Sequence, residues 1–527
     1  MTPATGFAEH LGFAEHLQRP HARGHAPAGA HTGAAGGAAC GDLIRVSLAI
    51  DPRGRVTGAG FDAAGCGAAI AAGSAVVALL RDSTLLQAAR LGPEQIAAEL
   101  GGLLPAKRHA AELAADALHR ALGAAARAHA SLANTPARTL VAMSGGVDSA
   151  VAALLTRDAG QEAIGVTLEL WSDPANDASL SCCSAEAVRS ARALAHELGL
   201  PHLSIDLRAE FRAGVVEPWL DQHAAGLTPN PCVRCNGFVR LDAMLELATR
   251  LGAPTLATGH YARVHRPAGE EWGGVSADPR ARVHRRPGHE GGETGPGTRE
   301  LPGEPERRGP LLRIAADAKK DQTYALAALS AESLARLRFP LGPLTKPEVR
   351  DLARRAGLAV ARRQDSQDLC FLAGTTQRDF LARHAQLGPR PGPILDAAGA
   401  RLGSHDGLHT LTIGQRRGLG LAAGRPLYVL ATDPASGAVT VGPRAGLLTR
   451  TVAIRDLVLR RPAPRVDAVK LRYRGRRLAC RMAEPLPAGA HAAGRVELLQ
   501  PAERTAPGQI ACLYAGDLVV GHGTIAG

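Results

Sequence analysis

From Arg138 onward, short apolar runs alternate with longer segments whose apolar residues recur at helical spacing. The short runs predict strands and the longer segments predict helices. This alternating order is typical of a parallel, doubly wound α/β sheet. The expected strands are 139–143, 163–170, 202–207 and 255–258, and the expected helices are 149–158, 184–198 and 237–251.

A compact α+β pattern comes before this unit, from Asp42 to about Ala128. Its alternating segments predict strands over 43–51 and 56–63, and its Ala-rich segments predict helices over 67–80 and 110–128. Residues 18–39 are rich in Gly, Ala, His and Pro, and we expect a loop there. Residues 131–137 contain Asn134-Thr135-Pro136 and predict a linker, so the N-terminal unit should be separable.

The C-terminal part is rich in short strand-like segments divided by turn residues, which favours a small β-barrel. Residues 267–310 are dominated by Gly, Pro, Arg and Glu, and we expect a disordered insertion or, alternatively, an RNA-binding arm. The chain is therefore predicted to be multidomain. Its expected parts are an α+β module over 1–130, the linker 131–137, an α/β domain over 138–375, a central domain over 376–445 and a barrel over 446–527.

The amino-acid composition shows a positive net charge and several cysteines, and both bear on function. The net charge is +12, which suits a polyanion such as RNA, although an Arg-rich composition alone could produce it. No run of about 18 apolar residues predicts a transmembrane helix, and the N-terminus lacks signal-peptide features, so no membrane partner and a cytoplasmic location are expected. An odd number of cysteines, nine, favours metal or thiol chemistry over a disulfide framework.

The segment Ser144-Gly145-Gly146-Val147-Asp148-Ser149 lies between a predicted strand and a predicted helix. Its glycines allow close backbone approach, and the N–H groups of the helix N-terminus favour phosphate oxygens. Asp148 could hold Mg²⁺. No Gly-Lys-Ser/Thr follows, so this is not a Walker motif. The segment resembles the pyrophosphate loop of ATP pyrophosphatases, which use ATP to adenylate a substrate.

Two cysteines are candidates for thiol chemistry. Cys235 ends Asn230-Pro231-Cys232-Val233-Arg234-Cys235 just before a predicted helix, and we expect the helix dipole to stabilise its thiolate. Cys370 lies in Asp365-Ser366-Gln367-Asp368-Leu369-Cys370. The segment Thr258-Gly259-His260-Tyr261-Ala262-Arg263 follows a predicted strand, where doubly wound folds bind ligands, and His260 there could order the loop.

Residues 138–527 resemble the bacterial tRNA-uridine 2-sulfurtransferases (MnmA). The matching motifs also include Cys182-Cys183-Ser184, Lys320-Asp321-Gln322, Gly403-Ser404-His405-Asp406-Gly407 and Thr412-Ile413-Gly414-Gln415. The resemblance implies that ATP adenylates the C2 oxygen of the wobble uridine in tRNAs of the Lys, Glu and Gln type. It also implies a persulfide on Cys370 and a nucleophile at Cys235, with a Cys235–Cys370 disulfide as the product.

The same resemblance implies ligand contacts and partners. Contacts to ATP are expected at Ala142, Met143, Ser144, Gly145, Gly146, Val147, Asp148, Ser149, Leu168 and Gly259. Contacts to tRNA are expected at Asn230, Pro231, Cys232, Lys320, Asp321, Gln322, Arg472 and Tyr473. A cysteine desulfurase or a sulfur relay protein is the implied sulfur donor.

Cys232 departs from the family pattern, in which many members carry Asp. Together with Cys235 and Cys370 it supplies three thiols, the ligand set for a [4Fe–4S] cluster with an open position. Persulfide and cluster mechanisms both remain open from the sequence.

Residues 12–128 resemble the U-type iron–sulfur scaffolds (IscU/NifU N-terminal type). The motifs are Ala39-Cys40-Gly41-Asp42, Gly65-Cys66-Gly67-Ala68 and Leu104-Pro105-Ala106-Lys107-Arg108-His109. The resemblance implies metal or cluster ligands at Cys40, Asp42, Cys66 and His109. Ala110 stands where the family has its third cysteine, so the module could bind metal or serve only in docking.

Two other functions fit parts of this pattern. The chain could be an iron–sulfur carrier whose ATPase half regulates delivery, but a regulator would not need two thiols beside the ATP loop. It could be an amidotransferase-type ATP pyrophosphatase, but no glutaminase-like domain is evident.

Overall fold

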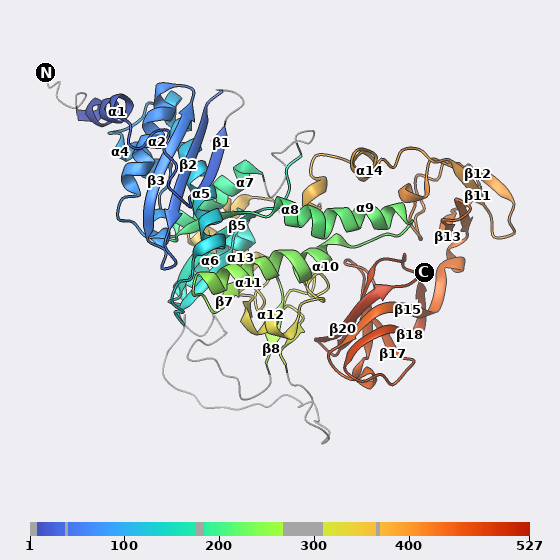
Figure 1. Ribbon diagram of the computed structural model, residues 1–527. Coiled ribbons are helices and arrows are strands. Elements are labelled where there is room, and N and C mark those ends of the chain that lie inside the picture. Colours follow the sequence, from blue (N-terminus) through green and yellow to red (C-terminus); the bar gives the residue numbers. More distant parts are fainter. Residues whose placement is uncertain (1–7, 37–40, 174–183, 267–308, 365–368) are drawn as a thin grey trace, which may run out of the picture.

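The computed structural model describes residues 8–36, 41–173, 184–266, 309–364 and 369–527. Four units follow one another along the chain, with the N-terminal unit at one end of the molecule and the barrel at the other (Figure 1). None of the helices in these ranges has the length and apolar character needed to cross a membrane. The segment 267–308, which covers nearly all of the expected insertion, lies outside the described residues.

The N-terminal unit is an antiparallel sheet of order β1-β2-β3 covered by helices. Its elements are α1 (Ala8–Gln18), β1 (His31–Gly36), β2 (Leu43–Ile50), β3 (Val56–Ala64), α2 (Gly67–Leu79), α3 (Leu85–Ala88), α4 (Pro93–Glu99) and α5 (Arg108–His129). The expected loop over 18–39 is wrong at His31–Gly36, which pairs with β2 as an edge strand. Gly33 makes this possible, since a Cβ there would lie 2.1 Å from the carbonyl oxygen of Ala117 in α5.

The second unit contains the predicted doubly wound sheet, which is parallel with the order β10-β7-β4-β5-β6. Its strands are β4 (Arg138–Ala142), β5 (Glu162–Glu169), β6 (His202–Asp206), β7 (Thr255–Ala257) and β10 (Leu337–Arg338). Its helices are α6 (Val147–Asp158), α7 (Ala185–Glu197), α8 (Arg208–Phe211), α9 (Glu217–Ala224), α10 (Pro231–Cys235), α11 (Leu241–Arg250), α12 (Ala331–Arg336) and α13 (Lys346–Arg355). The chain order reverses at β4, so a ligand crevice is expected at its carboxyl end.

Helix α5 of the N-terminal unit packs directly on β6, the edge strand of this parallel sheet. Gly123 lets the two backbones approach, because a Cβ there would lie 1.9 Å from the carbonyl oxygen of Ser204. The two units share one hydrophobic core. Residues 131–137 are also fixed at several points, since the N–H of Ser131 donates to Pro52 and that of Leu132 donates to Arg250. The segment therefore does not act as a free tether.

Buried polar contacts reinforce this junction. Asp116 on α5 pairs with Arg192 at 2.7 Å and with Arg189 at 2.8 Å. The His119 ring, fully buried, lies 2.9 Å from the carbonyl oxygen of His202 and 2.8 Å from that of Leu91. Because buried charges and imidazoles are costly to leave without partners, separating the two units would be strongly unfavourable.

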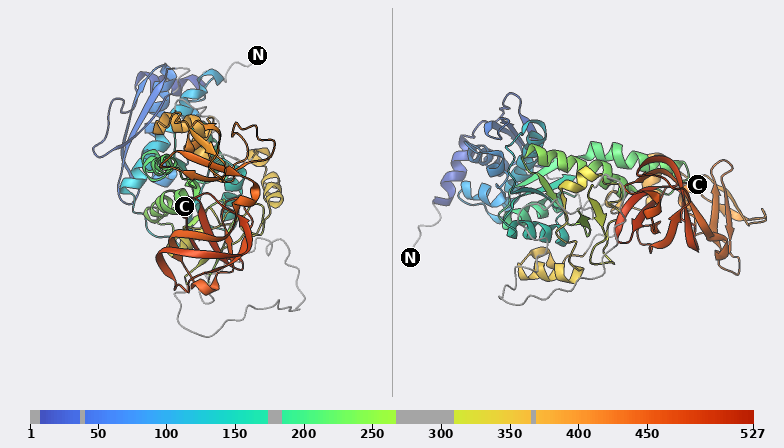
Figure 2. Two further views of the ribbon diagram at one scale, coloured as in Figure 1. Left: turned by 90° about the vertical axis from the view of Figure 1, so that its right-hand side faces the viewer. Right: turned by 90° about the horizontal axis from the view of Figure 1, so that it is seen from below.

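The last two units are β-rich and lie together at the far end of the molecule (Figure 2). The third unit begins with α14 (Gln377–Ala385) and has the strand order β12-β11-β14-β13, from β11 (Gly392–Leu395), β12 (Arg401–His405), β13 (Tyr428–Asp433) and β14 (Ala438–Gly442). The fourth is the expected barrel, from β15 (Leu448–Leu459), β16 (Ala468–Lys470), β17 (Leu478–Met482), β18 (Gly489–Glu503), β19 (Ile510–Ala515) and β20 (Leu518–Ile525). The β15–β20 pairing closes it, while β8 (Arg263–His265) and β9 (Leu311–Arg313) extend the sheet from the second unit.

Candidate nucleotide, sulfur and metal sites

The loop between β4 and α6 has the geometry of an anion site. Gly145 has a φ of +69°, a conformation that favours glycine. Ser149 accepts a hydrogen bond from the N–H of Ser144 at 3.1 Å and donates to the carbonyl of Gly146 at 3.0 Å, which closes the loop. Gly146 begins α6 without a side-chain cap, so the N–H groups of the first turn can bind a phosphate.

Two other expected nucleotide positions adjoin this loop. Gly259 follows β7, and a Cβ there would lie 2.8 Å from the backbone nitrogen of Ser149, so only glycine fits at this separation. Leu168 lies on β5, the strand beside β4, and is 7% exposed. Ala142 and Met143, at the end of β4, are buried beneath the loop. The structure therefore brings the predicted ATP residues to one edge of the sheet.

Asp148 has two partners that the sequence did not reveal. Lys346, at the first position of α13, places its Nζ 2.7 Å from Asp148 Oδ1. The Tyr261 hydroxyl donates to the same oxygen at 3.0 Å. Tyr261 is itself held by Gln322, whose side chain accepts from the Tyr261 N–H at 2.8 Å. Gln322 therefore holds Tyr261 in position beside the nucleotide loop.

A further cation joins the loop to the second thiol. Arg363 donates from its Nη1 to the carbonyl of Gly145 at 3.1 Å. Arg363 lies seven positions before Cys370, and residues 365–368 of the motif between them are outside the described residues. The segment that leads to Cys370 is thus hydrogen-bonded to the nucleotide loop.

The position of Cys235 corrects one sequence-based interpretation. Helix α10 begins with Asn230 as its cap, which accepts from the N–H of Cys232 at 3.0 Å and of Val233 at 3.4 Å. The helix starts at Pro231 and continues from α10 through Asn236–Arg240 into α11, so Cys235 lies inside it. The dipole argument therefore applies to Cys232, in the first turn, rather than to Cys235. Cys235 is 9% exposed. The exposed Cys232 is crowded by surrounding protein atoms, and this desolvation raises the pKa of its thiol, although the charge of Arg240 opposes the shift.

Cys370 is anchored by an aromatic cluster. Phe371 is buried and packs at 5.2 Å from Trp219 and at 6.0 Å from Phe211, between ring centroids. Phe211 ends α8, the helix that follows β6, and Trp171 also joins the cluster just after β5. Cys370 is half-buried and is therefore held near the carboxyl ends of β5 and β6, at the same sheet edge as the nucleotide loop.

The expected tRNA residues form two groups. Asn230, Cys232 and Tyr473 lie around Tyr324, whose ring is 6.3 Å from that of Tyr473, and Lys320 lies near Tyr473. Burial raises the pKa of Tyr324, opposed by its hydrogen bond to the backbone carbonyl of Ile510 at 2.9 Å. Burial together with the Cys232 charge raises the pKa of Tyr473. Pro231 is buried beside them at the start of α10. Asp321 turns inward, accepting from the N–H of Ala315 at 3.1 Å and from the Thr323 hydroxyl at 2.7 Å. Arg472 instead lines a cavity of about 530 Å³ on the barrel, with Arg444 and Arg476.

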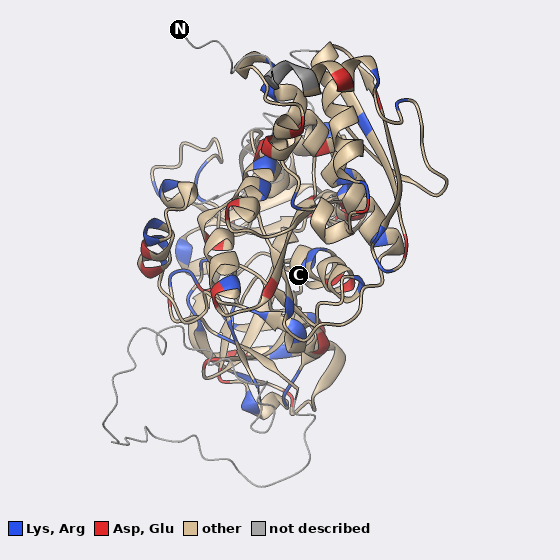
Figure 3. Cartoon of the chain, turned by 90° about the vertical axis from the view of Figure 1, so that its left-hand side faces the viewer, with Lys and Arg blue, Asp and Glu red and all other residues tan. Residues whose placement is uncertain are grey.

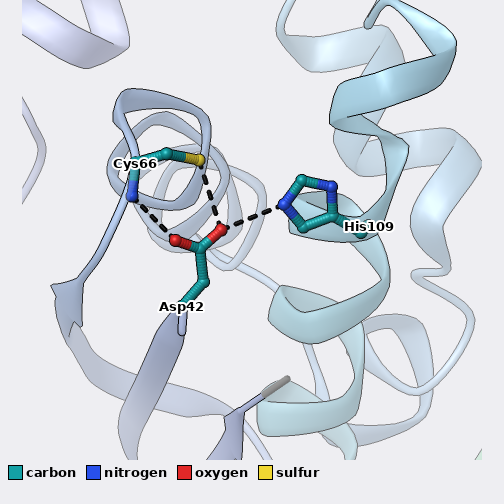
Figure 4. Close-up of side chains that lie close together, drawn as sticks. All are labelled: Asp42, Cys66 and His109. Atoms are coloured by element: carbon teal, nitrogen blue, oxygen red, sulfur yellow. Dashed lines mark hydrogen bonds and ion pairs between the residues drawn. The ribbon is translucent and has the colours of Figure 1, made fainter. Parts of the chain in front are cut away.

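The N-terminal unit holds a compact group of possible metal ligands (Figure 4). Asp42, Cys66 and His109 offer ligand atoms that all lie within 4.8 Å of one another. Asp42 accepts from the Cys66 N–H at 2.8 Å, from the Cys66 thiol at 3.2 Å and from His109 Nε2 at 3.0 Å. Burial raises the pKa of Asp42, but these hydrogen bonds outweigh it and hold the pKa below its usual value.

Thiolate, imidazole and carboxylate together suit Zn²⁺ or iron, so these residues fit the group that the scaffold resemblance implies. Cys40, the fourth expected ligand, lies outside the described residues, as do Cys182 and Cys183. Cys232, Cys235 and Cys370 are all described, yet their sulfur atoms do not form such a close group. Charged residues of both signs are interspersed on the side of the molecule that carries the N-terminal unit (Figure 3).

Comparison with known proteins assigns each unit. Residues 9–130 match the NifU-like N-terminal domain, and residues 137–374 match the tRNA methyl transferase HUP domain. Residues 378–443 match the tRNA methyl transferase PRC-barrel domain, and residues 459–525 match the aminomethyltransferase β-barrel domain.

Curated relatives cover the same span. The bifunctional protein NifU/MnmA of Rubrobacter xylanophilus is 39% identical over 525 residues, which is 97% of either chain. The tRNA-specific 2-thiouridylase MnmA of Roseiflexus castenholzii is 40% identical over 397 residues, 74% of this chain and 99% of the relative, and that of Moorella thermoacetica is 40% identical over 393 residues, 73% of this chain and 98% of the relative. The chain therefore belongs to the MnmA family of tRNA-specific 2-thiouridylases, in the form that carries a NifU-like N-terminal domain.

Proposed function

We propose that the chain catalyses the ATP-dependent 2-thiolation of the wobble uridine in tRNAs of the Lys, Glu and Gln type. The observation that carries the proposal is the hydrogen bond from Arg363 to Gly145. It links the segment leading to Cys370 with the loop suited to ATP phosphates, so activation and sulfur delivery occur at one edge of the sheet. The names of the relatives support tRNA as the substrate.

The first step is adenylation. The uridine O2 attacks the α-phosphorus of ATP, the bond from that phosphorus to the bridging oxygen breaks, and pyrophosphate leaves with the electron pair. The N–H groups of α6 and the loop stabilise the phosphates, and Gly259 leaves room beside them. Asp148 is the residue that would hold Mg²⁺, which would offset the phosphate charge.

The second step transfers sulfur. A persulfide on Cys370, supplied by a cysteine desulfurase or a relay protein, attacks C2 of the activated base with its outer sulfur. The Cys235 thiolate then attacks the inner sulfur of Cys370, so the sulfur–sulfur bond breaks and AMP leaves. The product is 2-thiouridine with a Cys235–Cys370 disulfide, which a thiol reductant returns to the starting state. The burial of Cys235 keeps this exchange away from water.

The group formed by Asn230, Cys232, Lys320 and Tyr473 is the proposed tRNA surface at this site. Tyr473 is exposed and offers a ring on which an unpaired base can stack. Arg472 and Arg476 line the cavity on the barrel, where they could contact the phosphates of the tRNA backbone at a distance from the reacting base.

Mass spectrometry of tRNA nucleosides tests the proposal. The full chain is incubated with unmodified tRNA, ATP and a persulfide-generating desulfurase, and 2-thiouridine should appear only when ATP is present. Cys235→Ser and Cys370→Ser should abolish the product without loss of ATP binding. Cys480→Ser, in the barrel core, is the matched control and should retain activity. Product formation by either site variant at the wild-type rate would refute the two-thiol mechanism.

A second candidate function is suggested by Asp42, Cys66 and His109, which would hold Zn²⁺ or an iron–sulfur cluster in the N-terminal unit. The full chain, purified without oxygen, should contain bound Zn²⁺ or iron, and Cys66→Ala should lose it while Cys480→Ala keeps it. Equal metal content in both variants would remove this site. The alternative cluster on Cys232, Cys235 and Cys370 predicts a visible absorption band that survives Cys66→Ala.

A further inference from the structure

Lys346 occupies an unusual position for a lysine. Lys346 is only 8% exposed, and its Nζ lies 2.7 Å from Asp148 Oδ1. Asp148 is in the first turn of α6, where the helix N-terminus faces the phosphate loop. The two residues are 198 positions apart in the chain, so the pair is made by the packing of α13 against α6.

Helix α13 is stabilised without this ion pair. Thr345 caps it through a capping box with Glu348, whose side chain accepts from the Thr345 N–H at 2.8 Å. The backbone N–H of Lys346 donates to Asp317 at 3.0 Å. The helix also buries Val349 and Ala353 against the loop domain. The position of the helix is therefore accounted for by caps and apolar packing.

A buried ion pair is a weak source of stability, because removing the ammonium from water costs about as much as the pair returns. An apolar side chain of similar length would pack at the same position. The location of the charge is thus better explained by an anion that arrives at the loop. Arg363 contributes a second cation, which donates to the carbonyl of Gly145 at 3.1 Å.

Two cations, Lys346 and Arg363, therefore reach the nucleotide loop, one at Asp148 and one at the Gly145 carbonyl. The α6 N-terminus adds partial positive charge in the same place. A nucleoside triphosphate carries its greatest negative charge on the β- and γ-phosphates, which are also the leaving group of an adenylation. A single cation that can leave Asp148 for those phosphates would also release the carboxylate to a metal ion.

We propose that Lys346 is a catalytic residue that binds the β- and γ-phosphates of ATP and exchanges Asp148 for them when the nucleotide enters. The proposal rests on the proposed adenylation and assigns its leaving-group contact. As the bond between the α-phosphorus and the bridging oxygen breaks, the electron pair remains on pyrophosphate, and the Lys346 ammonium donates a hydrogen bond to it. The ammonium keeps its protons throughout.

Comparing ATP with AMP isolates this contact. Binding of Mg·ATP and of AMP to the full chain is measured by calorimetry for the wild type, Lys346→Met and Lys346→Arg. The Met variant should bind ATP about 10- to 100-fold more weakly, which is the range for a hydrogen bond to a charged group. AMP affinity should stay unchanged, and Arg should restore most of the ATP affinity. Lys319→Met, an exposed neighbouring lysine, is the control and should match the wild type.

A labelling experiment on the wild-type chain tests the same contact without a substitution, so it does not require that a Lys346 variant folds. An ATP derivative with an acyl group on its γ-phosphate transfers that group to a nearby amine. The lysines of the chain are Lys107, Lys319, Lys320, Lys346 and Lys470. The label should appear on Lys346, as mapped by mass spectrometry, and excess ATP should prevent it while AMP should not.

The outcomes separate this inference from the proposed function. If the wild type forms pyrophosphate with tRNA, but Lys346→Met binds ATP as tightly as the wild type or the label appears on Lys320 instead, the inference is wrong and the function stands. Equal loss of ATP and AMP affinity would make Lys346 a structural support of the loop and would also overturn the inference. If the wild type releases no pyrophosphate with tRNA, the proposed function itself fails.

Discussion

The substitution Gly123→Ala tests whether the N-terminal unit is docked as the structure shows. In α5, a Cβ at this position would lie 1.9 Å from the carbonyl oxygen of Ser204 and 3.0 Å from its carbonyl carbon, both in β6. Ordinary contact begins at 3.4 Å, so the helix would have to move away by about 1.5 Å (3.4 − 1.9). Backbone atoms on both sides leave no side chain that could rotate to relieve the clash.

The sign of the change in unfolding free energy shows whether α5 is packed on β6 or is a helix free of the sheet. In an unconstrained helix, replacing Gly by Ala stabilises by about 1 kcal/mol. In a close-packed junction, an added methyl group costs about 1–3 kcal/mol. A shift of α5 would also stretch the Asp116–Arg192 ion pair at 2.7 Å and the His119 contacts. We expect the clash to dominate, with a net destabilisation of up to about 2 kcal/mol, the cost of about 1–3 kcal/mol less the gain of about 1 kcal/mol.

Denaturant unfolding with hydrogen exchange of β6 provides the measurement. Gly123→Ala should lower the unfolding midpoint and speed exchange in residues 202–206. Gly388→Ala is the control for an added methyl group without a clash, because a Cβ there meets nothing within 4 Å, and its midpoint should not fall. A Gly123→Ala protein that is more stable than the wild type, with unchanged exchange in β6, would show that α5 does not rest on the sheet.

Three further changes probe the sites. Asp148→Asn should lower tRNA-dependent pyrophosphate release by about 100-fold or more while sparing the fold, and an unchanged rate would contradict its assignment. Arg363→Met should reduce thiouridine formation by about 10-fold and pyrophosphate release by clearly less, because Arg363 contacts the loop as well as leading to Cys370, and equal losses in both assays would disprove the proposed link to Cys370. His223 is buried on α9, and burial lowers its pKa to about 4. Since the unfolded imidazole takes up a proton near pH 6.5 and the folded one does not, stability is lost as the pH falls from 6.5 toward 4, by about 2 kcal/mol at pH 5. His223→Gln should therefore show a smaller drop in unfolding midpoint between pH 7 and pH 5, and an identical drop would count against this assignment.

Local patterns in the sequence were sufficient to predict the parallel sheet and the nucleotide loop. Strands β4 to β7 lie within one or two residues of their predicted positions, because buried parallel strands are short apolar runs. The strand β1 was missed because HTGAAG has one β-branched residue, Thr32, and no large apolar side chain, and its glycine is selected by the approach of α5. That requirement is tertiary and leaves no periodic signal.

Features of the candidate site that depend on a single segment of the chain could be predicted from the sequence. The start of α10 could have been read from Asn230 followed by Pro231, a common cap and first-turn pair, which would have placed Cys235 inside a helix that begins at Pro231. The ion pair between Asp148 and Lys346 could not be predicted, because it joins two segments that are distant in the sequence. The direction of the Asp321 side chain also depends on packing, because the same residue could face a ligand or cap a backbone turn.

The direction of α5 on β6 has a consequence for fusing these two activities in one chain. His119 lies beside His202, Gly123 beside Ser204, and Arg127 beside Asp206, so the helix runs parallel to the strand. His109 is 18 residues before Arg127 on the same helix, which puts it about 27 Å back from the carboxyl edge. A sulfur or iron atom held there could not reach Cys370 while α5 stays in place. The fusion thus fixes the stoichiometry of the two sites rather than their proximity, and a direct handover within one molecule would require α5 to leave β6.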